Sequence, residues 1–333
     1  MSDLIESFLE FKQSNAGLSV RTIEVYRLAL ARLDGFMSGR SLLVATQDEL
    51  LAFTGPHLHK MKLSPSSRHP HIVAVKEFYK WLASTRQIPA SPAASLPYPK
   101  IGQALQRVMT LGNAERLMWA PDVSTFEGVR DSAMLLLLIG CGLRVSGLVD
   151  LNESNLIEDA MDGEVRLLLR VLEKGNKERK LSIPPDADLM LRMYLSHEGL
   201  KEIDRRLPNG DQVLFVSVRN RTVPSCDYTG EARRLNRRAV LEMVKKYGKR
   251  VGIPADQIHP HALRHLYGTE LAEGEVDILV RQRLMGHADP KSTAIYTSMA
   301  LRKLTRENDQ HNPLAKMRTP VSDLLKQLGK RKR

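Results

Sequence analysis

Hydrophobic residues recur at helical spacing through the first quarter of the chain. They follow one another every three or four positions between residues 4 and 36, and again between 64 and 82. This period predicts amphipathic helices. Ser64 followed by Pro65 is typical of a helix start, because the serine can cap the helix and proline suits its first turn. The pattern therefore predicts a helical first domain.

A proline-rich stretch follows. IPASPAASLPYPKIG, residues 88–102, contains Pro89, Pro92, Pro97 and Pro99. Proline lacks an N–H donor and fixes one backbone angle, so these residues break any helix and favour an extended path. We interpret residues 88–104 as an interdomain linker.

The pattern changes again after the linker. Helical spacing at 112–120 and 127–140 leads into short apolar runs at 164–184 around a KGNK turn, which predicts a β-hairpin with Lys174 at or beside its tip. A lone strand is predicted at 212–218. Further helices are predicted at 231–247, 260–273, 276–285 and 290–299. The fold class is therefore mainly α with a small β-sheet (α+β).

Composition limits the class of protein. The 333 residues suffice for two domains, and the two cysteines, Cys141 and Cys226, form no C-x-x-C pair. The N-terminus lacks the positive charge of a signal peptide, and the longest apolar run, at 133–140, is too short to span a bilayer. We expect a soluble cytoplasmic protein without a membrane partner. The net charge of +12 favours a polyanionic partner.

The predicted helix 231–247 concentrates positive charge. Apolar residues form one stripe of this segment, and the other faces are cationic. Such a helix is either a solvated surface or a surface that follows a phosphate backbone, which supplies affinity without reading sequence. The candidate DNA-binding residues are Arg233, Arg234, Arg237, Arg238, Lys245 and Lys246.

The segment HPHALRH, residues 259–265, collects histidines at the start of another predicted helix. His261 lies three positions before Arg264 and four before His265, so all three share one face. Three interpretations are open: a zinc site, a polar helix end, or a site that binds an anion. A zinc site needs a third ligand, and none stands out nearby at a recognisable spacing.

A wider set of residues suits phosphodiester cleavage without a metal. Arg144 and Arg264 can hold the phosphate oxygens bidentately while staying protonated. Tyr296 can act as the nucleophile if a base such as His261 takes its proton. Lys174 on the hairpin can protonate the departing alkoxide.

The ordered set GLRVSGL, the hairpin lysine, HPHALRH, LMGH and IYT resembles the tyrosine recombinase (phage integrase) family, including Xer-like recombinases and integrases of mobile elements. The resemblance covers most of the chain. It implies a helical, SAM-like core-binding domain at 1–87, the linker at 88–104, a catalytic domain at 105–300 and a C-terminal tail at 301–333. The two domains would form a C-shaped clamp on double-stranded DNA.

The resemblance also assigns roles. Arg144 and Arg264 would clamp the scissile phosphate, and Tyr296 would become joined to the DNA 3′ phosphate. Lys174 would protonate the leaving 5′ oxygen, and His261 would assist proton transfer. The covalent bond would preserve the phosphodiester energy, so no ATP, metal or other cofactor is expected.

The resemblance also implies that His287 would hydrogen-bond the phosphate region.

Further expectations concern assembly. Four protomers would exchange strands between two DNA sites, with accessory DNA-bending proteins as possible partners. The tail would supply a helix that packs on a neighbouring protomer, with an apolar face of Leu324, Leu325 and Leu328, or it would form an ordinary intramolecular helix.

One position departs from the family pattern, and other activities stay open. The family commonly has an acidic residue directly after the serine, in the pattern R-x-S-E-L, where this chain reads Arg144-Val145-Ser146-Gly147-Leu148. Asp150 is a candidate replacement. The alternatives are a telomere resolvase or type IB topoisomerase-like enzyme, and a catalytically inactive DNA-binding regulator of the same fold.

Overall fold

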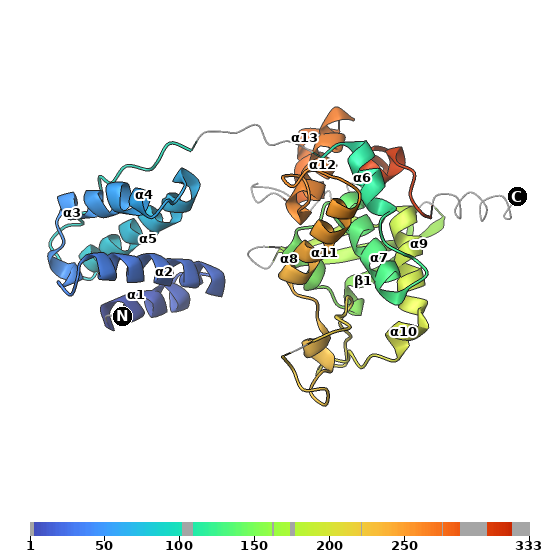
Figure 1. The fold of residues 1–333 in the computed structure, drawn as a ribbon, viewed down its shortest axis with the longest axis horizontal. Coiled ribbons are helices and arrows are strands. Elements are labelled where there is room, and N and C mark those ends of the chain that lie inside the picture. The colour runs from blue at the N-terminus through green and yellow to red at the C-terminus, as the bar shows by residue number, and fades with distance from the viewer. Residues whose placement is uncertain are drawn as a thin grey trace, which may run out of the picture. The chain divides into compact units, whose positions relative to one another are not determined.

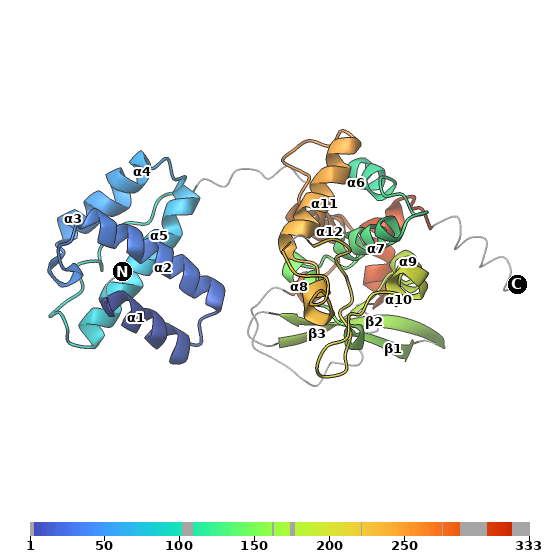
Figure 2. The same cartoon turned by 60° about the horizontal axis from the view of Figure 1, so that its bottom comes forward.

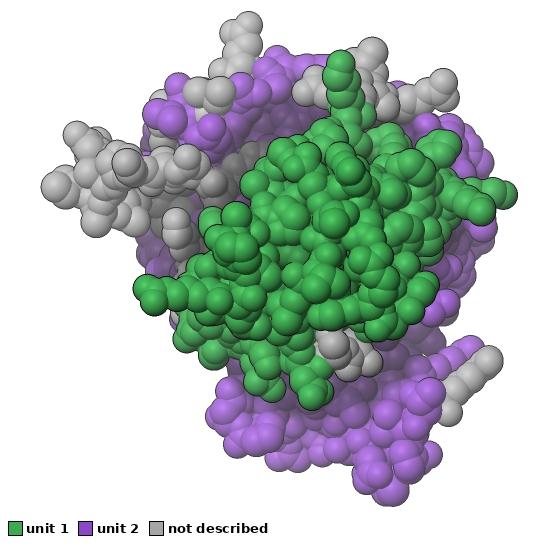
Figure 3. Space-filling model, turned by 90° about the vertical axis from the view of Figure 1, so that its left-hand side faces the viewer, with its two compact units in different colours: residues 1–105 green, residues 106–333 purple. Residues whose placement is uncertain are grey.

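The computed structural model divides the chain into two compact units, residues 1–105 and 106–333, which Figure 3 shows in two colours. The structure describes residues 3–101, 109–161, 163–173, 177–220, 222–274, 276–286 and 305–321. Each unit has its own hydrophobic core. We describe each unit by itself.

The first unit is helical, as its hydrophobic spacing predicts. Phe8, Leu30 and Phe78 are completely buried in its core. Ser64 caps the third long helix by accepting from the Ser67 N–H at 3.2 Å, and Pro65 follows in the first turn. Its helices are α1 (Asp3–Ser14), α2 (Val20–Phe36), α3 (Gln47–Ala52), α4 (Leu58–Lys60) and α5 (Pro65–Ser84), with a 3-10 turn at Leu42–Val44 and a π-turn at Phe53–His57.

The first unit continues into the stretch that we interpret as a linker. Ile88, Ala93 and Leu96 are buried in the same core as the helices. Residues 87–90 and 92–95 form bends and turns instead of the expected extended path, because local bonds such as the Ala94 N–H to the Ser91 carbonyl fold the chain back, and the apolar residues pack. The packing of the first unit therefore reaches Leu96, beyond the expected boundary at residue 87.

The second unit is built around one buried helix, α7 (Phe126–Gly140). Figure 1 shows α7 among the other helices of this unit, and it packs against α9 and α12. The other helices are α6 (Leu111–Met118), α8 (Val145–Val149), α9 (Pro185–Ser196), α10 (Glu198–Lys201), α11 (Arg237–Arg250), α12 (Pro260–Glu273) and α13 (Ile278–Met285), with 3-10 turns at Glu153–Asn155, Gly230–Arg233 and Pro313–Lys316.

The sheet contains the predicted hairpin and one strand more. Strands β2 (Glu164–Glu173) and β3 (Lys177–Ser182) are antiparallel neighbours, and β1 (Leu156–Met161) pairs with the other edge of β2. Figure 2 shows the strands side by side at one edge of the unit. The prediction missed β1, whose LIEDAM sequence carries three polar or small residues that weaken the strand signal.

Two predicted elements differ from the structure. Residues 212–218 do not form a strand. Val213 to Val216 are buried, but Gln212, Val213 and Val216 make only isolated bridges, each to a different segment, at Arg206, Asn152 and Arg234. The predicted helix 231–247 begins only at Arg237, where Asn236 accepts the Ala239 N–H at 2.9 Å and so caps it. The predicted helix 290–299 lies outside the described residues.

The C-terminal segment 305–321 packs on its own unit. Asn308 accepts the Tyr267 hydroxyl of α12 at 2.6 Å and donates to the Ser182 carbonyl at 3.2 Å. Lys316 pairs with Glu270 of α12 at 2.6 Å. This part of the tail is intramolecular, whereas Leu324, Leu325 and Leu328 lie outside the described residues. Among the described helices, none has the length and apolar character to cross a bilayer.

Candidate active site

The start of α12 gives its histidines different environments. His259 is the cap: its Nδ1 accepts the Ala262 N–H at 3.0 Å, and its Nε2 lies 3.0 Å from the Asp256 carbonyl. Pro260 follows at the first helical position, as its sequence position predicts. Both ring nitrogens of His259 are therefore close to backbone groups. His261, two positions further along the chain, has an exposed side chain.

Arg264 lies on the same side of α12 but is buried, with 3% of its surface exposed. Its guanidinium donates to the carbonyl of Gly142, in the loop before α8, and to the carbonyl of Met285, at the end of α13. A buried charge needs such partners, and a guanidinium offers several donors in a fixed plane. Arg264 thus joins three segments that are far apart in sequence.

Arg144 reaches the same place from the loop that precedes α8. It occupies the position before the first helical residue, and its Nη2 donates to the Gly286 carbonyl at 3.1 Å. The loop depends on Gly142, which has a positive φ of 58° and packs directly on the Tyr267 ring. A Cβ at Gly142 would lie 2.2 Å from that ring. The two arginines therefore converge on one helix end.

That helix end is the C-terminus of α13. Gly286 ends the helix in the left-handed conformation, at φ 60°, and its N–H bonds back to Gln282 and Arg283. The last carbonyls of a helix lack partners within it. Here Arg264 donates to the Met285 carbonyl, and Arg144 donates to the Gly286 carbonyl. His287 is the next residue in the sequence.

Electrostatics favour the neutral form of His261. Partial desolvation of the ring at the protein surface lowers the pKa of its imidazole, and the next largest effects come from nearby charges that lower the pKa further: His265, His259, Arg264 and Arg144. An ordinary histidine titrates near 6.5, so His261 stays unprotonated over a wider pH range. A neutral imidazole is the form that a general base requires.

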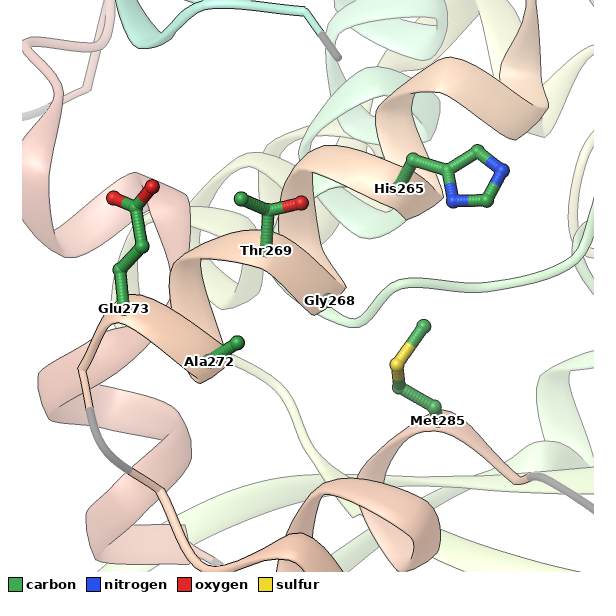
Figure 4. Close-up of a pocket in the computed structure, with 6 residues that line it drawn as sticks. All are labelled: His265, Gly268, Thr269, Ala272, Glu273 and Met285. Carbon is green, nitrogen blue, oxygen red and sulfur yellow. The ribbon is translucent and has the colours of Figure 1, made fainter. Parts of the chain in front are cut away.

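His265 contacts His261 and borders a pocket. The two rings meet edge to face with centroids 4.1 Å apart. Figure 4 shows the pocket between α12 and the end of α13, lined by His265, Gly268, Thr269, Ala272, Glu273 and Met285. The helices approach closely at Gly268, where a Cβ would lie 2.7 Å from the Met285 methyl. Among the described residues, no group of three or more His, Cys, Asp or Glu is placed to hold a metal.

The structure thus brings together three of the predicted catalytic residues: Arg144, His261 and Arg264. The other three, Lys174, His287 and Tyr296, lie outside the described residues. Their roles stay predictions, as do the chemical roles of the three that are placed.

The predicted DNA-binding residues have unequal surroundings. Arg237 and Arg238 are exposed in the first turn of α11. Lys245 pairs with Glu242 at 3.3 Å, and the Lys246 ammonium lies 5.0 Å from the centre of the Tyr247 ring.

Arg233 and Arg234 are tied to their own chain. The Arg233 guanidinium stacks over the Tyr228 ring at 3.8 Å. Arg234 donates to the carbonyls of Val149 and Leu151 at 2.9 and 3.0 Å. It also bonds the Asn152 side chain at 2.6 Å and the Glu231 carboxylate at 2.7 Å. DNA contact by these two residues stays a prediction.

Gly147 has little room for a side chain, because a Cβ there would lie 3.3 Å from a methyl of Val171 on β2. Asp150 has a pKa raised first of all by burial, and the described charges that act on it are Arg234, Arg237 and Glu231. A role for Asp150 as the replacement acid stays a prediction.

Arg179 on β3 completes the set of arginines at α13, and the sequence reasoning missed it. It donates to the carbonyls of Arg283, at 3.3 Å, and Leu284. A signal was present, because alternation along KERKLS places Arg179 on the same strand face as Leu181. A charged side chain on an apolar strand face needs hydrogen-bond partners within the fold, so this pattern indicates a structural role for Arg179.

Comparison with known proteins identifies the family. Residues 107–302 match the phage integrase family, and residues 5–86 match its N-terminal SAM-like domain. The chain is 30% identical over 312 residues to tyrosine recombinase XerD of Proteus mirabilis, with 93% of each chain covered. It is 29% identical over 318 residues to tyrosine recombinase XerC of Myxococcus xanthus, covering 95% of this chain and 99% of the relative.

Solved structures share the fold. The XerH site-specific recombinase bound to palindromic difH substrate gives a TM-score of 0.62 at 16% identity, with 92% of this chain and 82% of that chain covered. A lambda integrase dimer bound to a COC′ core site gives a TM-score of 0.61 at 15% identity, covering 87% of this chain and 98% of that chain.

The chain therefore belongs to the phage integrase family. Within that family it is a site-specific tyrosine recombinase. The resemblance inferred from its motifs and the predicted α+β fold are both confirmed.

Proposed function

We propose that this protein cleaves and rejoins DNA through a covalent 3′-phosphotyrosyl intermediate. The observation that carries the proposal is the convergence of Arg144 and Arg264, from two separate elements, on the residues that directly precede His287. Two guanidiniums can hold the non-bridging oxygens of a phosphate and stay charged while negative charge develops there.

The chemistry balances without an added reagent. The Tyr296 oxygen bonds to the phosphorus while the bond to the 5′ oxygen breaks. His261 takes the phenol proton, and Lys174 gives a proton to the leaving 5′ oxygen. His287 donates a hydrogen bond to the phosphate. Rejoining reverses these steps with a 5′ hydroxyl from the same or another strand, so the phosphodiester energy is kept.

Double-stranded DNA is the proposed substrate. The net charge of +12 supports a polyanionic partner. Arg237 and Arg238 are exposed at the start of α11 and suit contacts with the phosphate backbone. Lys245, Lys246, Arg233 and Arg234 remain proposed contacts as well, although Arg234 is the one most engaged within the chain.

Recombination needs two sites and several protomers. A structure with a TM-score of 0.60 and 16% identity to this chain, covering 92% of this chain and 77% of that one, is a lambda integrase tetramer bound to a Holliday junction. We propose a tetramer of this chain that exchanges strands pairwise, with the end of the tail packed on a neighbouring protomer. The process served is integration, excision or dimer resolution, and DNA-bending proteins are proposed accessory partners.

The decisive experiment traps the intermediate. The protein is incubated with a suicide DNA site, nicked so that the cleaved strand diffuses away, and a denaturant-resistant protein–DNA adduct is measured. The wild type is expected to form it and Tyr296→Phe to form none. Tyr98→Phe is a matched control, since Tyr98 is an exposed tyrosine of the first unit.

The same assay tests the alternatives. A bound cognate site without an adduct would contradict the proposal and favour the inactive DNA-binding regulator. An adduct whose duplex product is only relaxed or hairpinned, with no exchange between two sites, would favour the topoisomerase-like or telomere resolvase activity. In the expected case, Lys174→Ala slows cleavage, and a 5′-bridging sulfur, a better leaving group, restores it.

A further inference from the structure

Arg179 is a charged residue at an inward position of a strand. It pairs in register with Val171 of β2, which is 4% exposed, and Leu181 lies two positions further on the same face. Its neighbours along the strand, Glu178 and Lys180, are exposed. A guanidinium on the apolar face of a sheet is costly unless its donors are used.

The partners of Arg179 are backbone carbonyls of α13. It donates to Arg283, at 3.3 Å, and to Leu284. The next two carbonyls, of Met285 and Gly286, are served by Arg264 and Arg144. In the described part of the chain, the last turn of α13 is therefore held from three directions, and only Arg179 holds it from the hairpin.

The three arginines differ in whether they can keep their bonds to this turn when DNA is bound. Arg144 and Arg264 are the proposed phosphate clamps, so a bound phosphate competes with the α13 carbonyls for their donors. Arg179 is not one of the proposed clamps: it lies on the inward face of β3, where its charge acts on the buried thiol of Cys141 and the buried hydroxyl of Tyr267. It can keep its carbonyl partners while the other two arginines bind DNA.

We propose that Arg179 is a positioning residue for the recombination reaction. It anchors the last turn of α13 to β3 and so keeps Gly286, the residue directly before His287 in the sequence, in place when Arg144 and Arg264 engage the scissile phosphate. The inference rests on the proposed function, because it assigns His287 a place at the phosphate.

The test uses the full chain and the suicide DNA site. Arg179→Met removes the donors but keeps an unbranched side chain on the apolar face, and Arg179→Lys keeps a charged donor. Lys180→Met is the matched control, because it removes an exposed charge from the next position of the strand. Single-turnover adduct formation and DNA affinity are measured for each.

Arg179→Met is expected to slow adduct formation by about 10- to 100-fold, the effect of a misplaced reacting group, with DNA affinity unchanged within a few-fold. Arg179→Lys should recover most of the rate, and Lys180→Met should match the wild type. In a His287→Ala background, Arg179→Met should cause little further loss, because both changes remove the same contribution.

Other results would overturn the inference. An equal loss of rate in the His287→Ala background would mean that Arg179 does not act through His287, and a wild-type rate for Arg179→Met would mean that α13 needs no such anchor. If Arg179→Met does not fold, Arg179→Gln, which removes the charge but stays polar, gives the same comparison in both backgrounds. Absence of an adduct from the wild type itself would refute the proposed function, whereas a normal wild type with unaffected Arg179 variants would refute this inference alone.

Discussion

Arginines are used differently in the two units. In the first unit three of them pair with carboxylates near the surface, Arg21 with Glu24 at 2.9 Å, Arg27 with Glu6, and Arg40 with Glu49, and Arg32 bonds the His71 ring. In the second unit, where Arg130, Arg205 and Arg234 also pair with carboxylates, several arginines bond backbone carbonyls. These are Arg116, Arg130, Arg144, Arg170, Arg179, Arg205, Arg234, Arg250 and Arg264.

The difference follows from the backbone that each unit buries. Helices satisfy most of their own carbonyls, and the regular elements described in the first unit are all helices. The second unit buries irregular segments such as Val213 to Val216, whose carbonyls need other donors. Arg205 serves Val213 at 2.8 Å, and Arg130 serves Val216 at 2.9 Å. Part of the positive charge is therefore structural, and net charge overstates what is available to DNA.

The largest effect is expected for Arg264, which bonds backbone carbonyls and is also a proposed phosphate clamp. Arg264→Ala should lower the rate of DNA cleavage at least about 100- to 1,000-fold, because the charge that stabilises the transition state is lost. DNA affinity should change little, since many other cations supply it. Single-turnover cleavage and a binding titration measure the two effects.

Arg205→Ala is the control for this prediction. Arg205 also serves a carbonyl and pairs with Glu153, but it is not among the arginines at α13. It should lower the free energy of unfolding and leave cleavage near the wild-type rate. Equal losses of cleavage in the two variants would mean that Arg264 acts only through the fold.

A smaller effect separates the structural arginines from those that contact DNA. Arg234→Ala should lower the free energy of unfolding by about 1–3 kcal/mol for each carbonyl left without a donor, Val149 and Leu151. Arg238→Ala should leave stability unchanged and reduce the slope of log affinity against log salt by about one.

Chemical denaturation and binding at several salt concentrations measure these quantities. If Arg234→Ala reduced the salt slope as much as Arg238→Ala, Arg234 would contact phosphate despite its bonds within the chain. If Arg238→Ala lowered the free energy of unfolding, Arg238 would have a structural role despite its exposed position.

The smallest effect is expected in the first unit. Arg27→Ala removes a pair with Glu6 in which both side chains are more than a third exposed. Solvent screens such a pair, so the melting temperature should be unchanged within error at both low and high salt. Thermal unfolding of the full chain checks this. A loss as large as that of Arg234→Ala would remove the contrast between the units.

The predictions from sequence were most accurate where structure is local. The cap at Ser64 depends on a neighbour three residues away, and the hairpin depends on a nearby turn. The start of α11 was nevertheless misplaced, because the apolar stripe continues through a 3-10 turn that a cap then interrupts. Residues 212–218 looked like a strand because burial alone produces the same apolar run.

The candidate site divides in the same way. Residue types and order in HPHALRH, GLRVSGL and LMGH pointed to Arg144, His261 and Arg264, because phosphate chemistry restricts which side chains can serve. Arg179 was missed because its partners are carbonyls more than a hundred residues away. Every residue has a backbone carbonyl, so no sequence motif can indicate which carbonyl an arginine will bond.

The sequence by itself determined the apolar period of the helices, the capping residues, the glycine that ends α13 and the family to which the chain belongs. These properties depend on covalent neighbours or on residue type. The tertiary structure decided which arginines are committed to carbonyls, which histidine caps α12, and that α13 is held by β3, α12 and the loop before α8. Those outcomes depend on which irregular segments become buried together, and burial is a property of the whole fold.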